Sequence, residues 1–264
     1  MTGPFVVCCD LDGVVWRGEH ALPGAADAVA RLRAAGLRVV FLTNNSSATP
    51  GDVVARLGAA GVDATPADVA GSAEAAAAVL AGSVGPGATV LTCAGAGVVE
   101  ACRARGLRTT DVGPADAVVV GWHRDFDFER LRRAADVVRT GVPYVATNLD
   151  PTYPASRGLL PGAGALVAAV TAAGGRPPVV AGKPHPPTVE LVRERFGTRG
   201  VVVGDRPSTD GALAAALGWP FALVLSGIAG SAGEEPVPDP SPAFVAADLA
   251  ALAGPLVEAF APDS

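Results

Sequence analysis

The sequence predicts an α/β fold, in which a doubly wound parallel sheet is covered by helices and interrupted by an inserted α/β domain. Short apolar runs alternate with longer amphipathic segments along the chain, which is the pattern of parallel strands joined by crossover helices. These runs are continuous rather than alternating, so we expect the strands to be buried on both faces. Because only 5% of the residues are aromatic, the core must be built from small Ala, Val and Gly side chains.

The predicted strands are the β-branched apolar runs at residues 5–9, 38–42, 89–92, 117–120, 143–146, 178–181, 200–203, 221–225 and 244–246. The predicted helices are the amphipathic segments at residues 24–35, 50–60, 73–81, 97–105, 128–139, 163–173, 188–196 and 209–217. The segment 230–242 is rich in Gly, Glu and Pro, which favour turns, so we expect a surface loop there.

Composition and charge exclude several classes of protein. The chain has 264 residues, which fits one or two domains, and its net charge of −6 comes without a basic run. We therefore do not expect a protein that binds nucleic acid through a basic face. The uncharged stretches 158–175 and 211–233 are interrupted by Pro and Gly, so neither is expected to span a membrane.

The cysteines and the N-terminal segment indicate the compartment. The four cysteines are Cys8, Cys9, Cys93 and Cys102, and they lack the spacing of a metal site. We expect buried thiols in a reducing environment. The first residues have no basic region before an apolar one and so do not resemble a signal peptide. The expectation is a soluble, cytoplasmic protein with no membrane or nucleic-acid partner.

Two carboxylates end the first predicted strand. Asp10 and Asp12 lie two residues apart, so both side chains are expected on one face of the strand end. Carboxylates this close repel each other unless a cation intervenes. The pair therefore suits an acid and base, or a nucleophile beside a proton donor, together with an oxygen site for Mg²⁺. A simple strand-to-turn cluster ending at Gly13 is the alternative.

A polar loop follows the second strand. Thr43, Asn44 and Asn45 offer hydroxyl and amide groups just before a predicted helix, and such a loop can bind phosphate. Plain helix capping, with Thr49 before Pro50, is the alternative, and both interpretations can hold together.

Charged residues also follow two late strands. Lys183 lies between a Gly and a Pro that fix its backbone, although a lone lysine is usually a solvated surface residue. Asp205 ends the next strand and Asp210 opens a helix, so with Asp10 they could hold a cation. An Asx turn and an ordinary helix cap would explain the two late acids equally well.

Each of these four motifs follows a predicted strand, and sites in parallel sheets form beyond the carboxyl ends of strands. We therefore expect the motifs to converge on one crevice. The chain from 72 to 177 carries no such motif but has its own strand–helix alternation. We predict a core domain of residues 1–71 and 178–264 with an inserted α/β domain of residues 72–177.

Taken together, the motifs resemble those of the haloacid dehalogenase (HAD) superfamily, and specifically its subfamily IIA of NagD-type, p-nitrophenyl and phosphoglycolate phosphatases. The resemblance is carried by Asp10-Leu11-Asp12-Gly13, Thr43-Asn44-Asn45-Ser46, Gly182-Lys183-Pro184 and Gly204-Asp205-Arg206 with Asp210. The insert segments 147–150 and 160–164 also resemble this branch, whereas His123 departs from it, because an Asp is common there. The resemblance implies a Rossmann-like HAD core with an inserted cap domain of the C2 type.

That resemblance also implies a Mg²⁺-dependent phosphomonoesterase that acts on small phosphorylated metabolites through an aspartyl-phosphate. Asp10 would attack phosphorus, Asp12 would exchange protons with the leaving group and water, and Lys183 would offset phosphoryl charge. The implied phosphate-binding residues are Thr43, Asn44, Asn45 and Lys183. The implied magnesium ligands are Asp10, Asp12 through its carbonyl, Asp205 and Asp210.

Three other functions share part of this pattern. A dehalogenase of the same superfamily attacks carbon and needs neither Asp12 nor Mg²⁺, which disfavours it. A phosphotransferase or phosphomutase uses every residue named above and differs only in the acceptor. A receiver-like phosphoacceptor module, which is not an enzyme, is much shorter and lacks an inserted domain.

The insert is expected to select the substrate. Its polar loop at 147–157 is the best candidate for the substrate-facing edge, and a Pro-rich connector is the alternative. The residues expected to face the substrate are Asn148, Asp150, Tyr153 and Arg157. We expect a monomer or a homodimer.

Overall fold

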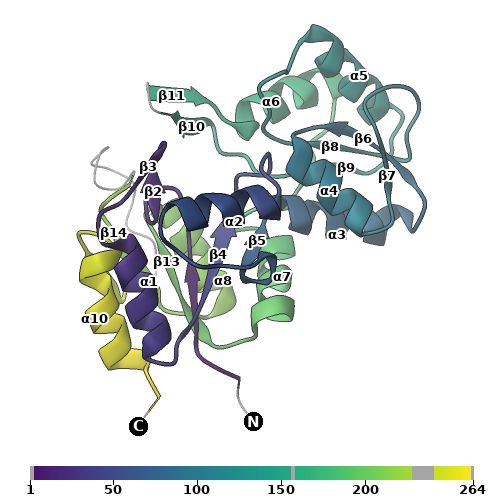
Figure 1. Ribbon diagram of the computed structural model, residues 1–264. Coiled ribbons are helices and arrows are strands. Elements are labelled where there is room, and N and C mark those ends of the chain that lie inside the picture. Colours follow the sequence, from purple (N-terminus) through teal and green to yellow (C-terminus); the bar gives the residue numbers. More distant parts are fainter. Residues whose placement is uncertain (1–2, 156–157, 228–240, 263–264) are drawn as a thin grey trace. The chain divides into compact units, whose positions relative to one another are not determined.

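A computed structural model describes residues 3–155, 158–227 and 241–262 (Figure 1). The chain forms two compact units, each with its own parallel sheet, which confirms the predicted α/β class. The first unit comprises Met1–Thr43, Asp52–Ala70 and Val189–Ser264, and the second comprises Asn44–Gly51 and Gly71–Thr188. Most of the predicted surface loop at 230–242 lies outside the described residues, as does Arg157.

The first unit is built on a six-stranded sheet in the order β15-β14-β13-β1-β4-β5. Its strands are β1 (Val6–Cys9), β4 (Arg38–Thr43), β5 (Val69–Gly71), β13 (Gly200–Gly204), β14 (Phe221–Val224) and β15 (Phe244–Ala246). Strand β1 lies parallel to both β4 and β13, and Cys9 is in register with Phe41 and Val203. The residues that follow these strands therefore emerge at one edge of the sheet.

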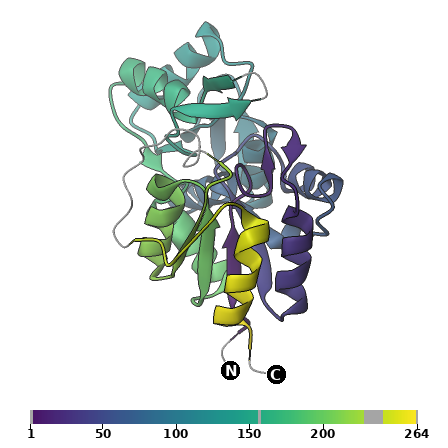
Figure 2. The ribbon, with the colours of Figure 1, turned by 90° about the vertical axis from the view of Figure 1, so that its left-hand side faces the viewer.

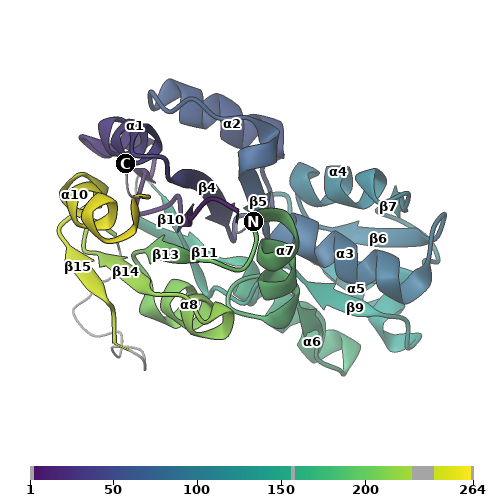
Figure 3. The same ribbon diagram turned by 90° about the horizontal axis from the view of Figure 1, so that it is seen from below.

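Helices cover both faces of this sheet (Figure 3). One face carries α1 (Ala25–Ala34), α2 (Pro50–Ala59) and α10 (Leu249–Phe260), and the other carries α7 (Pro186–Phe196) and α8 (Ala212–Leu217). Helices α1 and α10 lie side by side (Figure 2). Because both faces are covered, every residue of β1 and β13 is buried, as their continuous apolar runs predict.

Shorter elements complete the first unit. They are the hairpin of β2 (Trp16–Arg17) and β3 (His20–Ala21), the 3₁₀ turn η1 (Pro66–Asp68) and the π-helical turn η2 (Pro207–Gly211). The hairpin and η2 follow β1 and β13, respectively, and so hold residues next to the polar sheet edge.

The second unit has a five-stranded parallel sheet in the order β12-β9-β8-β6-β7. Its strands are β6 (Thr89–Cys93), β7 (Arg108–Thr110), β8 (Ala117–Val120), β9 (Tyr144–Ala146) and β12 (Val179–Val180). Its helices are α3 (Ser72–Val84) and α4 (Ala96–Ala104) on one face and α5 (Phe128–Arg139) and α6 (Ala163–Gly174) on the other (Figure 1). A hairpin of β10 (Thr152–Ala155) and β11 (Gly158–Pro161) extends away from this body.

The second unit contains more of the chain than the predicted insert 72–177. Strand β12 pairs with β9, so the predicted strand at 178–181 belongs to this sheet rather than to the first. The loop 44–51 also belongs to this unit, since the Gly97 N–H donates to the Ser47 carbonyl at 3.0 Å. That residues 72–177 fold as a domain separate from residues 1–71 and 178–264 stays a prediction.

The structure also tests what the sequence predicts about the cysteines and about membrane-spanning segments. All four cysteines are buried thiols outside any disulfide, as the sequence predicts. Among the helices that the structure describes, we find none that is both long enough and apolar enough to cross a bilayer.

Candidate active site

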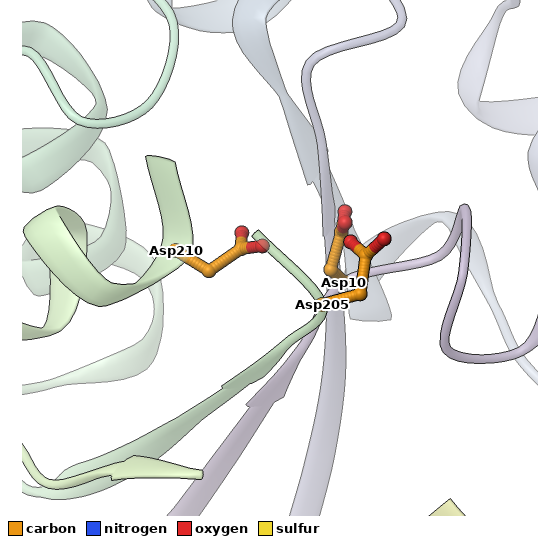
Figure 4. A group of neighbouring side chains, drawn as sticks. All are labelled: Asp10, Asp205 and Asp210. Atoms are coloured by element: carbon orange, nitrogen blue, oxygen red, sulfur yellow. The ribbon is translucent and has the colours of Figure 1, made fainter. Parts of the chain in front are cut away.

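Three acids meet at the carboxyl edge of the first unit's sheet (Figure 4). One carboxylate oxygen each from Asp10, Asp205 and Asp210 lies within 4.8 Å of the others. Asp10 follows β1, where its backbone N–H donates to the Val203 carbonyl at 2.8 Å, and Asp205 follows β13. The parallel register of these two strands is what brings the acids together.

The donor set of this cluster fits a hard divalent cation. Asp210 is fully buried, Asp205 nearly so, and Asp10 is partly exposed. Three carboxylates this close repel one another strongly away from bulk water, and a cation between them removes that repulsion. Carboxylate oxygens are also the ligands that Mg²⁺ prefers. The three side chains could therefore hold Mg²⁺, and their role as ligands stays a prediction.

The π-helical turn η2 directs Asp210 toward the cluster. The sequence predicts an α-helix over 209–217, but α8 begins only at Ala212 and η2 precedes it. The N–H of Asp210 donates to the Arg206 carbonyl at 2.8 Å, and the Arg206 N–H donates back to Oδ2 of Asp210 at 3.2 Å. Such wide turns occur often at functional sites, because they redirect a side chain without ending a helix.

Two glycines enclose Asp205. Gly13 has a φ of +87°, which side chains rarely tolerate, and a Cβ there would collide with the Asp205 carboxylate. A Cβ at Gly227 would collide with the same carboxylate. The Ser226 hydroxyl donates to the Gly13 carbonyl at 2.6 Å and joins the two loops. No local motif in the sequence marks Gly227 as a residue of the site.

Asp12 is held in a tight turn beyond Asp10. The indole Nε1 of Trp16 donates to Oδ1 of Asp12 at 3.0 Å, and the turn closes through the Val15 N–H, which donates to the Leu11 carbonyl at 2.9 Å. The Arg56 guanidinium lies over the Trp16 ring at 3.9 Å from its centroid. Trp16 could not be assigned to the site from the sequence, because only the folded turn brings its indole to Asp12.

The predicted phosphate-binding residues divide between the two units. Thr43 is the buried last residue of β4 in the first unit, and Asn44 and Asn45 begin the second. Within the second unit, Oδ1 of Asn44 accepts a 2.8 Å hydrogen bond from the backbone N–H of Lys183. The structure therefore joins the second and third motifs. Lys183 is 5% exposed, so the alternative of a solvated surface lysine does not apply.

The predicted substrate-facing residues of the insert occupy different environments. Asn148 is buried, whereas Asp150 and Tyr153 are partly exposed. The Tyr153 ring stacks on Trp122 with centroids 4.4 Å apart, and Nε1 of Trp122 donates to the Pro161 carbonyl at 2.9 Å. Trp122 thus connects both strands of the β10–β11 hairpin to the end of β8.

His123 is buried and forms its contacts inside the second unit. It is 6% exposed, its Nδ1 donates to the Gly121 carbonyl at 3.0 Å, and its Nε2 lies 3.9 Å from Sγ of Cys93. Burial lowers the pKa of His123 and raises the pKa of Cys93 to about 12, so the thiol can donate to the neutral imidazole. The departure from the family at this position is therefore accommodated inside the second unit's core.

Known proteins resemble this chain along most of its length. Residues 7–108 match the family model of haloacid dehalogenase-like hydrolases, and residues 180–252 match a model described as HAD-hydrolase-like. The D-glycerol 3-phosphate phosphatase of Mycobacterium tuberculosis is 41% identical over 249 residues, which cover 92% of this chain and 69% of that protein. The dihydroxyacetone phosphatase of Corynebacterium glutamicum is 34% identical over 235 residues, which cover 88% and 85%.

Solved structures agree with the sequence comparison. The crystal structure of the glycerol phosphate phosphatase from M. tuberculosis in complex with magnesium has a TM-score of 0.85 and 39% identity, covering 94% of this chain and 75% of that one. A p-nitrophenyl phosphatase from Archaeoglobus fulgidus has a TM-score of 0.85 and 28% identity, covering 97% and 100%. Fold and sequence thus define a hydrolase built on a doubly wound parallel sheet. The chain belongs to the haloacid dehalogenase-like hydrolases, in their subfamily IIA, which confirms the predicted family and fold.

Proposed function

We propose that this protein is a Mg²⁺-dependent phosphomonoesterase that hydrolyses small phosphorylated metabolites through an aspartyl-phosphate. The observation that carries the proposal is the cluster of Asp10, Asp205 and Asp210, with a second acid, Asp12, held two residues beyond Asp10. Relatives that are named as phosphatases of glycerol phosphate, dihydroxyacetone and p-nitrophenyl compounds support the class of reaction.

In the first half of the reaction, a carboxylate oxygen of Asp10 attacks phosphorus. The bond between phosphorus and the ester oxygen breaks, and the carboxyl of Asp12 gives its proton to the leaving alkoxide. Asp12 must therefore keep a proton while Asp10 has lost its own. The hydrogen bond from Trp16 holds the Asp12 carboxyl in one orientation for this transfer.

In the second half, water attacks the phosphorus of the aspartyl-phosphate. Asp12, now a carboxylate, takes a proton from that water, and the bond between phosphorus and Asp10 breaks. Inorganic phosphate leaves, and both acids return to their starting forms. The reaction thus proceeds by two displacements at phosphorus instead of one direct displacement by water. Because the leaving group of the second displacement is the Asp10 carboxylate, the activation barrier of hydrolysis is lower.

The other groups of the proposed site stabilise the negative charge of the phosphate ester. Bound Mg²⁺ supplies positive charge that offsets the repulsion between the Asp10 carboxylate and the phosphate ester. The residues that would hold it are Asp10, Asp205, Asp210 and the carbonyl of Asp12. On the family resemblance, Thr43, Asn44 and Asn45 would bind phosphate oxygens and Lys183 would offset the phosphoryl charge.

A phosphate-release screen tests the function. The purified protein with Mg²⁺ is given p-nitrophenyl phosphate, glycerol 3-phosphate, dihydroxyacetone phosphate and hexose phosphates, with and without added free sugars. We expect inorganic phosphate to be released from at least one metabolite ester. Transfer of phosphate to the added sugar instead of release would identify a phosphotransferase, and no turnover of any ester would contradict the proposal.

Three finer features belong to the same proposal. We propose that the predicted insert, residues 72–177, acts as a cap that selects the substrate, with Tyr153 at its substrate-facing edge. We also propose a cytoplasmic enzyme, supported by four buried cysteines that remain thiols outside any disulfide. Its state as monomer or homodimer can be measured by light scattering during size-exclusion chromatography.

A further inference from the structure

We infer that Asn148 is a positioning residue that fixes Lys183 through Asn44. The inference rests on the proposed function only for what Lys183 does to a phosphoryl group. It revises the expectation that Asn148 and Asp150 contact substrate. The residues concerned all lie in the second unit. We call Asn44, Ser72, Asn148 and Asp150 the Asn44 brace.

Asn148 uses both polar atoms of its side chain inside the protein. Its Nδ2 donates to the Asn44 carbonyl at 2.7 Å, and its Oδ1 accepts from the Asp150 N–H at 3.0 Å. The side chain is 3% exposed, so it is both satisfied and covered. A buried amide held at both ends orders its neighbours, because leaving either partner unpaired would cost free energy.

The side chain of Asn44 in turn binds the backbone of Lys183. The Oδ1 of Asn44 accepts from the Lys183 N–H at 2.8 Å, and its Nδ2 lies 3.3 Å from the Lys183 carbonyl and 3.2 Å from Oδ2 of Asp150. The Ser72 hydroxyl adds a second donor to the Asn44 carbonyl at 2.7 Å. Backbone and side chain of Asn44 are thus both held, and its side chain holds the Lys183 backbone.

The turn that carries Lys183 packs directly against the brace. A Cβ at Gly182 would lie 2.6 Å from Oδ1 of Asn44 and would also collide with the Thr147 carbonyl. The turn therefore has no space to shift toward the brace. If the brace loosens, the backbone of Lys183 loses its hydrogen-bond acceptor, and the ammonium group loses its defined position.

This arrangement predicts a specific kinetic signature. The phosphoryl group is common to all substrates, so a misplaced Lys183 should slow every ester by the same factor. A residue that contacts the rest of the substrate should instead change the order of preference among esters. The two roles of Asn148 are therefore distinguished by the ranking of substrates and not by the size of the loss.

The experiment compares Asn148→Ala and Asn148→Asp with wild type on p-nitrophenyl phosphate and on the three best metabolite esters. We expect kcat/KM to fall on the order of 10²-fold for all of them, with the ranking unchanged. Thr92→Val is the matched control, because it removes a partly buried side-chain hydrogen bond to the Thr110 carbonyl elsewhere in the second unit. It should keep near wild-type rates. A changed ranking in Asn148→Ala would overturn the inference.

Substitutions of Asp150 provide a conservative rescue. Asp150→Asn keeps an oxygen that can accept from Asn44, whereas Asp150→Ala does not. We expect Asp150→Asn to retain most of the activity that Asp150→Ala loses. If the two variants lose activity equally, Asp150 acts through its negative charge, and its hydrogen bond to Asn44 does not explain the loss.

Hydrogen exchange tests the brace without any substrate. In the chain of 264 residues, the Lys183 amide should exchange roughly 5-fold faster or more in Asn148→Ala than in wild type. If Asn148→Ala does not fold, Ser72→Ala removes one donor to Asn44 and should give a smaller change in the same direction. An unchanged Lys183 exchange rate in folded variants would overturn the inference even if the phosphatase activity is confirmed. If wild type hydrolyses no ester, the proposed function fails, while the exchange result still decides the brace.

Discussion

The indole Nε1 of Trp16 donates a 3.0 Å hydrogen bond to Oδ1 of Asp12, four residues earlier in the chain. Trp16 is itself buried beneath the Arg56 guanidinium, so the donor cannot easily move away. A fixed donor restricts the rotation of the Asp12 carboxyl. Because Asp12 is the proposed proton donor, this contact connects a structural residue of the hairpin to the chemistry of the leaving group.

Removing that hydrogen bond should slow proton transfer selectively. Trp16→Phe keeps an aromatic ring under Arg56 but removes the donor, and we expect kcat for alkyl phosphates to fall about 3- to 10-fold. p-Nitrophenyl phosphate, whose leaving group needs little protonation, should be affected less. Trp219→Phe is the matched control, since it removes the bond from Nε1 to the Thr198 carbonyl in the same unit. Equal loss on both kinds of ester would argue against this role.

The two glycines around Asp205 should be required for metal affinity. Gly13→Ala and Gly227→Ala place a methyl group where the Asp205 carboxylate lies, so we expect the affinity for Mg²⁺ to fall at least about 10-fold. Gly218→Ala is the control, because Gly218 also has a positive φ, of +73°, but has open space around it. It should lose stability from backbone strain while keeping its metal affinity in a calorimetric titration.

Magnesium should stabilise the fold measurably. The three carboxylates repel one another without a cation, so Mg²⁺ should raise Tm, and Asp205→Asn or Asp210→Asn should abolish the increase. Activity should vanish after exhaustive chelation and return with Mg²⁺. Ca²⁺ should restore little activity, because it takes more ligands at longer distances. Full activity in the chelated protein would refute the metal assignment.

His123 predicts how stability depends on pH. Burial is the main cause that lowers its pKa, so the unfolded chain binds a proton more readily than the folded chain. The free energy of unfolding should therefore decrease as pH falls below the ordinary histidine value of 6.5. In urea titrations between about pH 7.5 and about pH 5.5, His123→Gln should lose less stability than wild type. The exposed His20→Gln is the control, and equal losses in all three proteins would contradict the assignment.

Much of the fold could be predicted because buried parallel strands have a strong local pattern. The runs at 117–120 and 244–246 coincide with β8 and β15. Edge strand β7 was missed because its residues are polar and partly exposed. Helix α10 was missed because Pro255 lies inside it and it has few polar residues to mark a solvent face. Only its packing beside α1 identifies it.

The acids of the site could also be predicted, because each follows a strand whose place in the sheet the sequence indicates. What could not be predicted depends on contacts between distant residues. Asn44 and Asn148 are 104 positions apart, and Gly227 reaches Asp205 from a loop with no motif. No local pattern encodes such pairs. The same is true of β12, whose short apolar run is compatible with either sheet.

The most direct test of the proposed mechanism is the turnover of Asp10→Asn under saturating Mg²⁺ and substrate. The amide keeps the shape of the side chain and cannot form the aspartyl-phosphate, so we predict a folded protein that still binds phosphate esters and has no measurable turnover. Asp27→Asn, at an exposed position of α1, is the control and should match wild type. Retention of more than a few per cent of the wild-type rate, in a preparation free of contaminating phosphatase, would contradict nucleophilic attack by Asp10.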